Sequence, residues 1–391
     1  MNRKKVLIVS TFDFEGPRWG RNFPLARAFE RNGYDVTMLV TERRKSLKLY
    51  TVKECEGVKV ICFNAILSFT IRKQPIGFLT LSFWLRLIYA MIHKFDIVYS
   101  DCGETPCSGW PCLVNKWIFA SKYLSEYGDL LGKGGYYDMK SKTFKMLFGA
   151  YFLWAITYFR KKADFTIVLS KVMGEYVEKE MGIAKEKIVL VSGGSLPEKI
   201  EYKLPEKKAG EPIYLGYIGV DDYEISGILP VLDAIRTKYN GKFKVRLFGH
   251  KLSQAVIDKY SLKDIIIECG WVDVIKGQEK VRKCDIFLLM RENLLIGAMG
   301  WPNKLGDYLS YGRPVMISPY GDLVEFVNKH SDGFIVVDRN NNKDIEEKLE
   351  AIVNSNIDLV QKGAYNRIVA EKEISWDARI EKLLDYIDND N

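Results

Sequence analysis

Short apolar runs alternate with amphipathic segments along most of the chain, a pattern typical of parallel sheets built from βα units. Five apolar runs in the first half predict strands, at residues 6–10, 35–40, 96–100, 165–169 and 187–191. A helix is expected at 21–32, because the segment has helical spacing and ends at Gly33.

The second half repeats the alternation after a segment, 192–211, whose glycines, prolines and mixed charges indicate a linker. Strands are expected at 213–219, 244–248, 265–268, 286–289, 315–317 and 334–337, and helices at 227–239, 253–260, 344–354 and 376–387. We therefore predict an α/β protein with Rossmann-like domains at 1–200 and 211–375. Ligands of such sheets bind at the carboxyl ends of the strands.

The segment from Trp301 to Ser318 carries the clearest chemical signal. Pro302 suits the first turn of a helix, where its missing N–H has no cost. Lys304 would lie beside the free N–H groups of that turn, and Asp307 follows one turn later. A helix N-terminus with a lysine suits a phosphate, and a nearby carboxylate suits the hydroxyls of a ribose. A surface Lys and Asp on an ordinary αβ unit would show the same spacing.

This segment resembles the donor-binding signature of family 4 glycosyltransferases, Pro-x-Lys-x-x-Glu-Tyr-x-x-x-Gly-Arg/Lys-Pro-Val. Asp307 stands where the family has Glu, and it can still accept two hydroxyl hydrogen bonds. The resemblance covers nearly the whole chain and is strongest at 216–338. It implies the GT-B fold: two Rossmann-like domains facing a cleft, with a last helix, 376–391, that crosses back to the first domain.

By this resemblance the chain is a hexosyltransferase that uses a nucleotide diphosphate sugar, with retention and without metal or cofactor. The implied donor-binding residues are Pro302, Asn303, Lys304, Asp307, Arg291, Gly219 and Gly249. The turn after the first strand resembles the family's flexible loop for donor phosphates or acceptor, and its candidates are Gly16, Arg18, Gly20 and Arg21.

A second segment, 125–135, resembles the Asp-Trp-x-Asp-x-x-Gly-Arg-Gly-Gly stretch of polysaccharide-building relatives. It follows a strand expected at 117–120, so its carboxylates should lie at the crevice. Glu126, Asp129 and Asp101 are the candidate catalytic residues, able to orient an acceptor hydroxyl. A turn or N-cap role is the alternative for Asp129.

Three features depart from the family pattern. The family's pair of Glu residues separated by seven positions is incomplete, because counting back from Asp307 reaches Met299. None of the three histidines falls at a strand end of the first domain, so the family's His role is vacant or taken by Asp101 or Glu126. The loop 220–224 is acidic where members carry Arg and Lys. The diphosphate charge must then be neutralised by Lys304, helix termini and Arg291.

The net charge of +8 is concentrated in the first half, where residues 1–200 carry 31 Lys and Arg against 19 Asp and Glu. Two apolar stretches lie there, 76–93 and 144–159, the second followed by Arg160, Lys161 and Lys162. Both are short for a membrane span and favour contact with an anionic membrane surface instead. The alternative is two ordinary helices packed on the sheet. We expect a cytoplasmic protein, peripheral on the inner face of the plasma membrane, acting on a cell-surface glycan or lipid-linked acceptor.

Other classes fit less well. The turn after the first strand lacks Gly-x-Gly-x-x-Gly, which argues against a dinucleotide oxidoreductase. The cysteine spacing is not a zinc pattern, the start of the chain shows no secretory signal, and no nucleic-acid-binding module is recognisable. A GT-B nucleotide-sugar epimerase and a non-catalytic nucleotide-sugar-binding protein remain alternatives.

Overall fold

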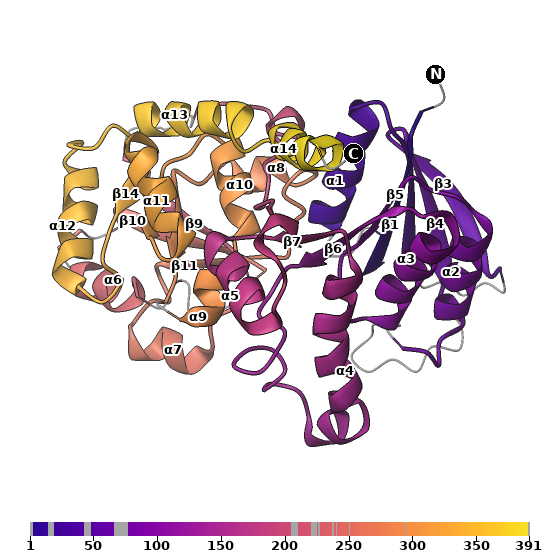
Figure 1. The fold of residues 1–391 in the computed structure, drawn as a ribbon. Helices are drawn as coiled ribbons and strands as arrows, with labels where there is room; N and C mark the ends of the chain where they lie inside the picture. The colour runs from indigo at the N-terminus through magenta and orange to yellow at the C-terminus, as the bar shows by residue number, and fades with distance from the viewer. Residues whose placement is uncertain are drawn as a thin grey trace. The chain divides into compact units, whose positions relative to one another are not determined.

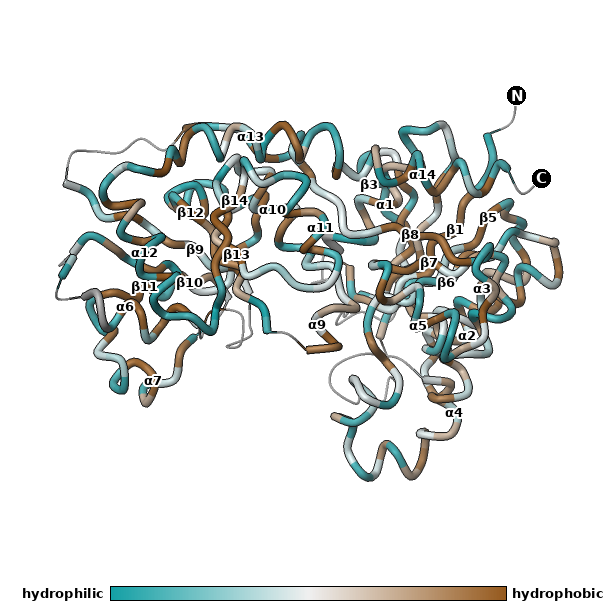
Figure 2. The backbone as a smooth tube through the Cα atoms, turned by 60° about the vertical axis from the view of Figure 1, so that its left-hand side comes forward, coloured by the Kyte–Doolittle hydropathy of each residue, from teal (hydrophilic) through white to brown (hydrophobic). Residues whose placement is uncertain are grey.

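The computed structural model of the chain contains two sheets, each flanked by helices (Figure 1). The structure describes residues 3–14, 19–42, 48–65, 77–204, 210–219, 225, 227–236, 238–239, 241–249, 251–292 and 294–389. The chain divides into unit 1, Met1–Ser192 with Arg379–Asn391, and unit 2, Gly193–Ala378. The strands of both units are mostly hydrophobic (Figure 2).

Unit 1 has a sheet in the order β3-β4-β2-β1-β5-β6-β7-β8. Its strands are β1 (Lys5–Asp13), β2 (Asp35–Glu42), β3 (Tyr50–Cys55), β4 (Val58–Asn64), β5 (Ile97–Ser100), β6 (Lys122–Tyr127), β7 (Phe165–Val168) and β8 (Ile188–Leu190). All neighbours pair in parallel except β3 and β4. That hairpin turns through Glu56 and Gly57, both at positive φ, as a type I′ turn requires.

The helices of unit 1 connect its parallel strands, except the last one, which joins the unit from the end of the chain. They are α1 (Trp19–Arg31), α2 (Leu81–Ile92), α3 (Pro106–Phe119), α4 (Lys142–Lys162), α5 (Lys171–Met181), the short η1 (Lys185–Lys187) and, from the chain's end, α14 (Trp376–Asn389). Side-chain oxygens of Thr80, Ser141 and Ser170 cap α2, α4 and α5 by accepting a backbone N–H of the first turn. Helix α3 packs between α2 and α4.

The strand expected at 117–120 is wrong. These residues end α3, and the chain turns at Ala120, whose φ is positive, before β6 begins at Lys122. An apolar run of that length is ambiguous between a helix end and a strand. The consequence is that Glu126 lies inside β6 instead of in a loop after a strand.

Unit 2 has an all-parallel sheet in the order β11-β10-β9-β12-β13-β14. Its strands are β9 (Ile213–Ile218), β10 (Phe243–Phe248), β11 (Ile266–Gly270), β12 (Ile286–Met290), β13 (Val315–Ser318) and β14 (Phe334–Val336). Counted from β9, this order reverses between β9 and β12, and such a switch point is where Rossmann-like sheets bind ligands. In unit 1 the order reverses between β1 and β5.

The helices of unit 2 are α6 (Leu229–Arg236), α7 (Gln254–Lys259), α8 (Gln278–Val281), α9 (Leu295–Met299), α10 (Asn303–Ser310), α11 (Asp322–Lys329), α12 (Asn342–Val353) and α13 (Leu359–Lys372), with η2 (Pro197–Lys199) and η4 (Ser331–Gly333). Helix α10 is followed by its C-cap, Tyr311, and then by Gly312, whose φ is +60°. The next residue, Arg313, is buried and donates to the carbonyls of Cys284 and Lys203. The Gly-Arg-Pro end of the motif is therefore a structural anchor.

Both apolar stretches of the first half form helices, α2 within 76–93 and α4 around 144–159. In the part of the chain that the structure describes, no helix combines the length and hydropathy needed to cross a bilayer.

Candidate functional site

Helix α10 begins at the switch point of unit 2. Pro302 is its N-cap and is buried, while Asn303 is exposed. The hydroxyl of Tyr308 accepts the N–H of Ile218 at 3.0 Å, and the Tyr308 ring stacks on Phe287 at 4.2 Å. The helix is thereby tied to the end of β9 and to β12, so its first turn has a defined position over the sheet.

Lys304 and Gly219 come together at the carboxyl end of β9. The Lys304 ammonium donates to the Tyr217 hydroxyl at 3.4 Å and lies 4.6 Å from the centre of that ring. A Cβ on Gly219 would lie 2.6 Å from the Lys304 nitrogen and 2.4 Å from the Tyr217 oxygen. A side chain at position 219 would therefore push Lys304 away.

Asp307 lies one turn after Lys304 and is partly exposed. Its carboxylate accepts no hydrogen bond from the residues that the structure describes. Burial raises the pKa of Asp307 to about 7, with Lys304 lowering it and Asp273 adding to the rise. A carboxylate with unused acceptor positions beside a cation is suited to a ligand that supplies hydroxyl donors.

The predicted glycine Gly249 directly follows β10, with a φ of +83°, and donates its N–H to the carbonyl of Gly270 at 2.8 Å. Its place is therefore at the same carboxyl edge as Gly219.

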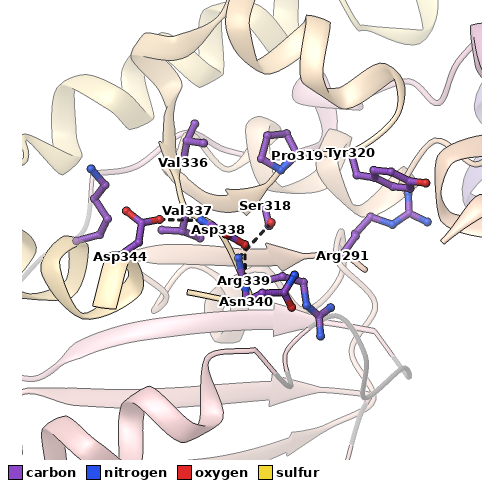
Figure 3. A pocket seen from close by; sticks show the side chains of 11 residues that line it. Arg291, Ser318, Pro319, Tyr320, Val336, Val337, Asp338, Arg339, Asn340 and Asp344 are labelled. Atoms are coloured by element: carbon purple, nitrogen blue, oxygen red, sulfur yellow. Dashed lines mark hydrogen bonds between the residues drawn. The ribbon is translucent and has the colours of Figure 1, made fainter. Parts of the chain in front are cut away.

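Arg291 lies in the lining of a cavity of about 520 Å³ (Figure 3). The cavity is at the carboxyl ends of β12, β13 and β14 and is also lined by Tyr320 and Arg339. Arg291 donates to the carbonyl of Gly300 at 3.3 Å, and Arg339 pairs with Glu292 at 3.0 Å. Neither Lys304 nor Asp307 is among the described residues of this lining.

In unit 1, Asp101 lies at the switch point directly after β5 and is 2% exposed. Its carboxylate accepts hydrogen bonds from both donors of Thr11 and from the side chains of Ser10, Asn22 and Ser108, at 2.9–3.2 Å. These donors come from the end of β1, from α1 and from α3. Asp101 therefore holds the edge of the sheet in shape, and a part in catalysis stays a prediction.

Glu126 is 1% exposed in β6. Arg21 binds its two oxygens in a bidentate pair, with distances of 3.1 Å and 2.8 Å, and Tyr99 also donates to it. Arg21, a candidate for contact with the donor phosphates or the acceptor, thus pairs with Glu126 in the structure. Burial, with Glu126 as the second cause, raises the pKa of Tyr99 well above its usual value.

Asp129 is partly exposed in the turn after β6. That turn needs two of its glycines, since Gly134 has a φ of +82° and a Cβ on Gly135 would lie 2.0 Å from the Leu130 carbonyl oxygen. Gly16 and Arg18 lie outside the described residues, and Gly20 lies in the first turn of α1.

Two buried arginines of unit 1 were not expected. Arg160, which the sequence groups with Lys161 and Lys162, is fully buried; it pairs with Glu104 at 2.8 Å and donates to the Glu126 carbonyl at 2.7 Å. Arg86 is also fully buried and donates to the Ser10 carbonyl at 2.6 Å. For Arg86 the sequence contains a signal, a lone arginine within an apolar stretch, which suits the core when a partner is present. Arg160 has none, because it stands at the end of its stretch beside two lysines.

Known proteins match this chain in two ways: a family model matches part of unit 2, and solved structures match both units. Residues 212–355 match the family described as "Glycosyl transferases group 1". No curated protein matches the sequence significantly.

Solved structures match over nearly the full chain. Sucrose-phosphate synthase from Thermosynechococcus elongatus has a TM-score of 0.69 at 14% identity and covers 100% of both chains. Anabaena HepE in complex with UDP-glucose has a TM-score of 0.68 at 12% identity, covering 98% of this chain and 99% of its own. WaaG, a glycosyltransferase involved in lipopolysaccharide biosynthesis, has a TM-score of 0.64 at 11% identity, covering 96% and 98%.

The structural likeness shows the GT-B fold of two Rossmann-like domains, and the family match covers the unit that carries Lys304 and Asp307. The chain is a glycosyltransferase with the GT-B fold.

Proposed function

We propose that this glycosyltransferase moves a hexosyl group from a nucleotide diphosphate sugar to a cell-surface glycan or lipid-linked saccharide. The observation that carries the donor class is the grouping at the switch point of unit 2. There Lys304 lies against Gly219, and Asp307 offers a carboxylate with unused acceptor positions one turn later.

The chemistry of these groups matches a nucleotide diphosphate. The Lys304 ammonium and the positive N-terminal end of α10 attract the diphosphate, and the missing side chain of Gly219 leaves the space that the Lys304 ammonium occupies. Asp307 accepts the ribose hydroxyls. UDP and UDP-glucose are the ligands named for HepE, so uridine donors are the first to test.

In the proposed reaction, the bond between the anomeric carbon and the diphosphate oxygen breaks. A bond to an acceptor hydroxyl oxygen forms on the same face, and the hydroxyl proton leaves with the diphosphate. Stabilising the leaving diphosphate is the main task, for which fixed cations and N–H groups suffice without metal or cofactor.

The acceptor is assigned to unit 1. Of the three predicted carboxylates there, Asp129 is partly exposed, whereas Asp101 and Glu126 are buried and surrounded by donors. We assign acceptor contact to Asp129 and a positioning role to the other two. The basic first half and its apolar helices support action at the inner face of the plasma membrane.

The experiment is a panel of nucleotide sugars incubated with the protein, with and without saccharide or lipid-linked acceptors and with a chelator. Acceptor-dependent release of nucleoside diphosphate that survives the chelator supports the proposal. Conversion of the donor to an epimeric nucleotide sugar in the absence of acceptor would identify an epimerase instead. Donor binding without any turnover would identify a non-catalytic protein.

A further inference from the structure

Helix α4 is too long for the sheet beneath it. Its 21 residues span about 31 Å, whereas the 4 residues of β7 span about 13 Å. The helix starts at the carboxyl edge of the sheet, after β6, and runs back along it. Its first half therefore extends past the strands of its unit, as Figure 1 shows.

Burial along α4 agrees with this geometry. Four of its five buried residues, Ala155, Ile156, Phe159 and Arg160, lie in the second half. The first half packs mainly on the preceding loop, where a Cβ on Gly149 would lie 2.7 Å from the Tyr137 hydroxyl. We call residues 136–148 the α4 tip.

Large apolar side chains are exposed on the tip, next to the exposed polar residues Asp138, Ser141, Lys142 and Thr143. Met139, Met146 and Leu147 are 65%, 78% and 61% exposed, and Phe148 is also exposed. Three of them are consecutive in a helix and so point over an arc of about 200°. A groove in a protein partner covers one side of a helix, whereas the hydrocarbon of a bilayer surrounds an inserted tip on all sides.

The charges of the tip are complementary to an anionic lipid surface. The tip carries three lysines, Lys140, Lys142 and Lys145, against one acid, Asp138, whose carboxylate accepts the N–H of Gly134, and no Asp or Glu follows from residue 139 to 163. Lys140 lies 5.5 Å from the centre of the Phe144 ring, and Lys145 lies 5.5 Å from that of Tyr137. Lysines above exposed apolar and aromatic side chains are typical of elements that insert at a membrane interface.

We propose that the α4 tip inserts into an anionic bilayer and that the acceptor is an amphipathic, lipid-linked saccharide drawn from that bilayer. The tip is joined directly to the turn that carries Asp129, and both lie at the carboxyl edge of the unit 1 sheet. An acceptor whose lipid stays in the membrane beside the tip can present its sugar hydroxyl to this edge. The acceptor class rests on the proposed transferase function, whereas bilayer insertion does not.

The test is co-sedimentation of the full chain with vesicles, without donor or acceptor. Phosphatidylcholine vesicles containing phosphatidylglycerol are compared with phosphatidylcholine alone, at low and high salt. The tip variant is M146S with L147S. The matched control is I88S with I92S, which removes two apolar side chains of α2 that are 52% and 68% exposed.

We expect the wild type to bind the anionic vesicles at low salt and the tip variant to lose at least about tenfold in partitioning. The α2 control should lose less than about twofold. Lys142→Glu in the tip should weaken binding more than Lys161→Glu at the other end of the helix. Because all these side chains are exposed, unchanged thermal unfolding should accompany every variant.

Wild-type protein that does not sediment with anionic vesicles at low salt would overturn the proposal. An equal loss of partitioning in the tip variant and in the α2 control would also overturn it. Self-association that the tip variant abolishes would assign the tip to a second copy of the chain instead. Vesicle binding without release of nucleoside diphosphate would refute the transferase function alone, while turnover without vesicle binding would refute the inserted tip alone.

Discussion

Replacing Asp307 by Asn separates stability from donor binding, because the two should change in opposite directions. The carboxylate is held in a site that raises its pKa from 3.8 to about 7. A shift of this size corresponds to roughly 4 kcal/mol between the charged and neutral forms. Since the side chain is partly open to solvent, we reduce the expected effect to about 2 kcal/mol.

The sign for stability follows from the direction of the shift. A carboxyl whose pKa is higher in the folded state binds its proton more tightly there, so stability falls as pH rises from about 4 to about 7 and stays lower above. The amide of D307N has no charge to bury. The variant should therefore be more stable than the wild type at pH 8, by about 2 kcal/mol, and nearly equal to it at pH 4.

Donor binding should change the other way. The ionised carboxylate accepts hydroxyl hydrogen bonds that an amide only partly replaces, so D307N should lose roughly 1.5–3 kcal/mol of affinity for the nucleoside diphosphate. Urea unfolding at both pH values and calorimetric titration measure the two effects, with D332N, at an exposed carboxyl of the same unit, as the control. A folded D307N with unchanged affinity would remove Asp307 from the donor site. A loss of stability at pH 8 would refute the reasoning on the pKa.

Three further variants test single contacts. Lys304→Ala should weaken nucleoside diphosphate binding by at least about tenfold and free nucleoside binding much less; equal losses would place Lys304 away from the phosphates. Gly219→Ala should weaken diphosphate binding, because the added methyl group displaces the Lys304 ammonium. The control is Gly174→Ala, where a Cβ meets nothing closer than 3.6 Å and binding should not change. Calorimetric titration with the nucleoside diphosphate compares the two variants. Arg160→Met should cost about 3–5 kcal/mol in urea unfolding by leaving a buried carboxylate unpaired, while Lys161→Ala should stay within about 0.5 kcal/mol. Similar stabilities for these last two variants would contradict the burial of Arg160.

Much of the fold could be predicted because strand burial leaves a direct trace in the sequence. The apolar runs 6–10, 286–289 and 315–317 fall on strands that are buried along most of their length. Local chemistry also located the start of α10, where Pro302 and the residues after it give a helix entry. The meeting of Lys304 with Gly219 follows from parallel strands whose carboxyl ends share one edge.

What the sequence did not predict depends on contacts between distant residues. Arg160, beside Lys161 and Lys162, looks like a surface cation in local sequence, and the burial of both Arg160 and Arg86 depends on acceptors elsewhere in the unit, such as Glu104 and the Ser10 carbonyl. The run 117–120 looked like a strand because a helix end and a short strand share the same apolar pattern. The antiparallel hairpin of β3 and β4 was also missed: β3 is exposed or half exposed and has no continuous apolar run, and β4 was overlooked although its run 60–63 is apolar and buried.

The order in which the chain is made bears on how the units fold. Unit 2 is one continuous segment, whereas unit 1 is completed by α14 at the far end of the chain. Lys4 pairs with Asp388, and Lys122 donates to the carbonyl of Ile387. During synthesis the first unit must therefore wait, without its last helix, until residues 379–389 have left the ribosome. Unit 2 can form earlier, and we expect residues 193–378 expressed alone to fold more readily than residues 1–192.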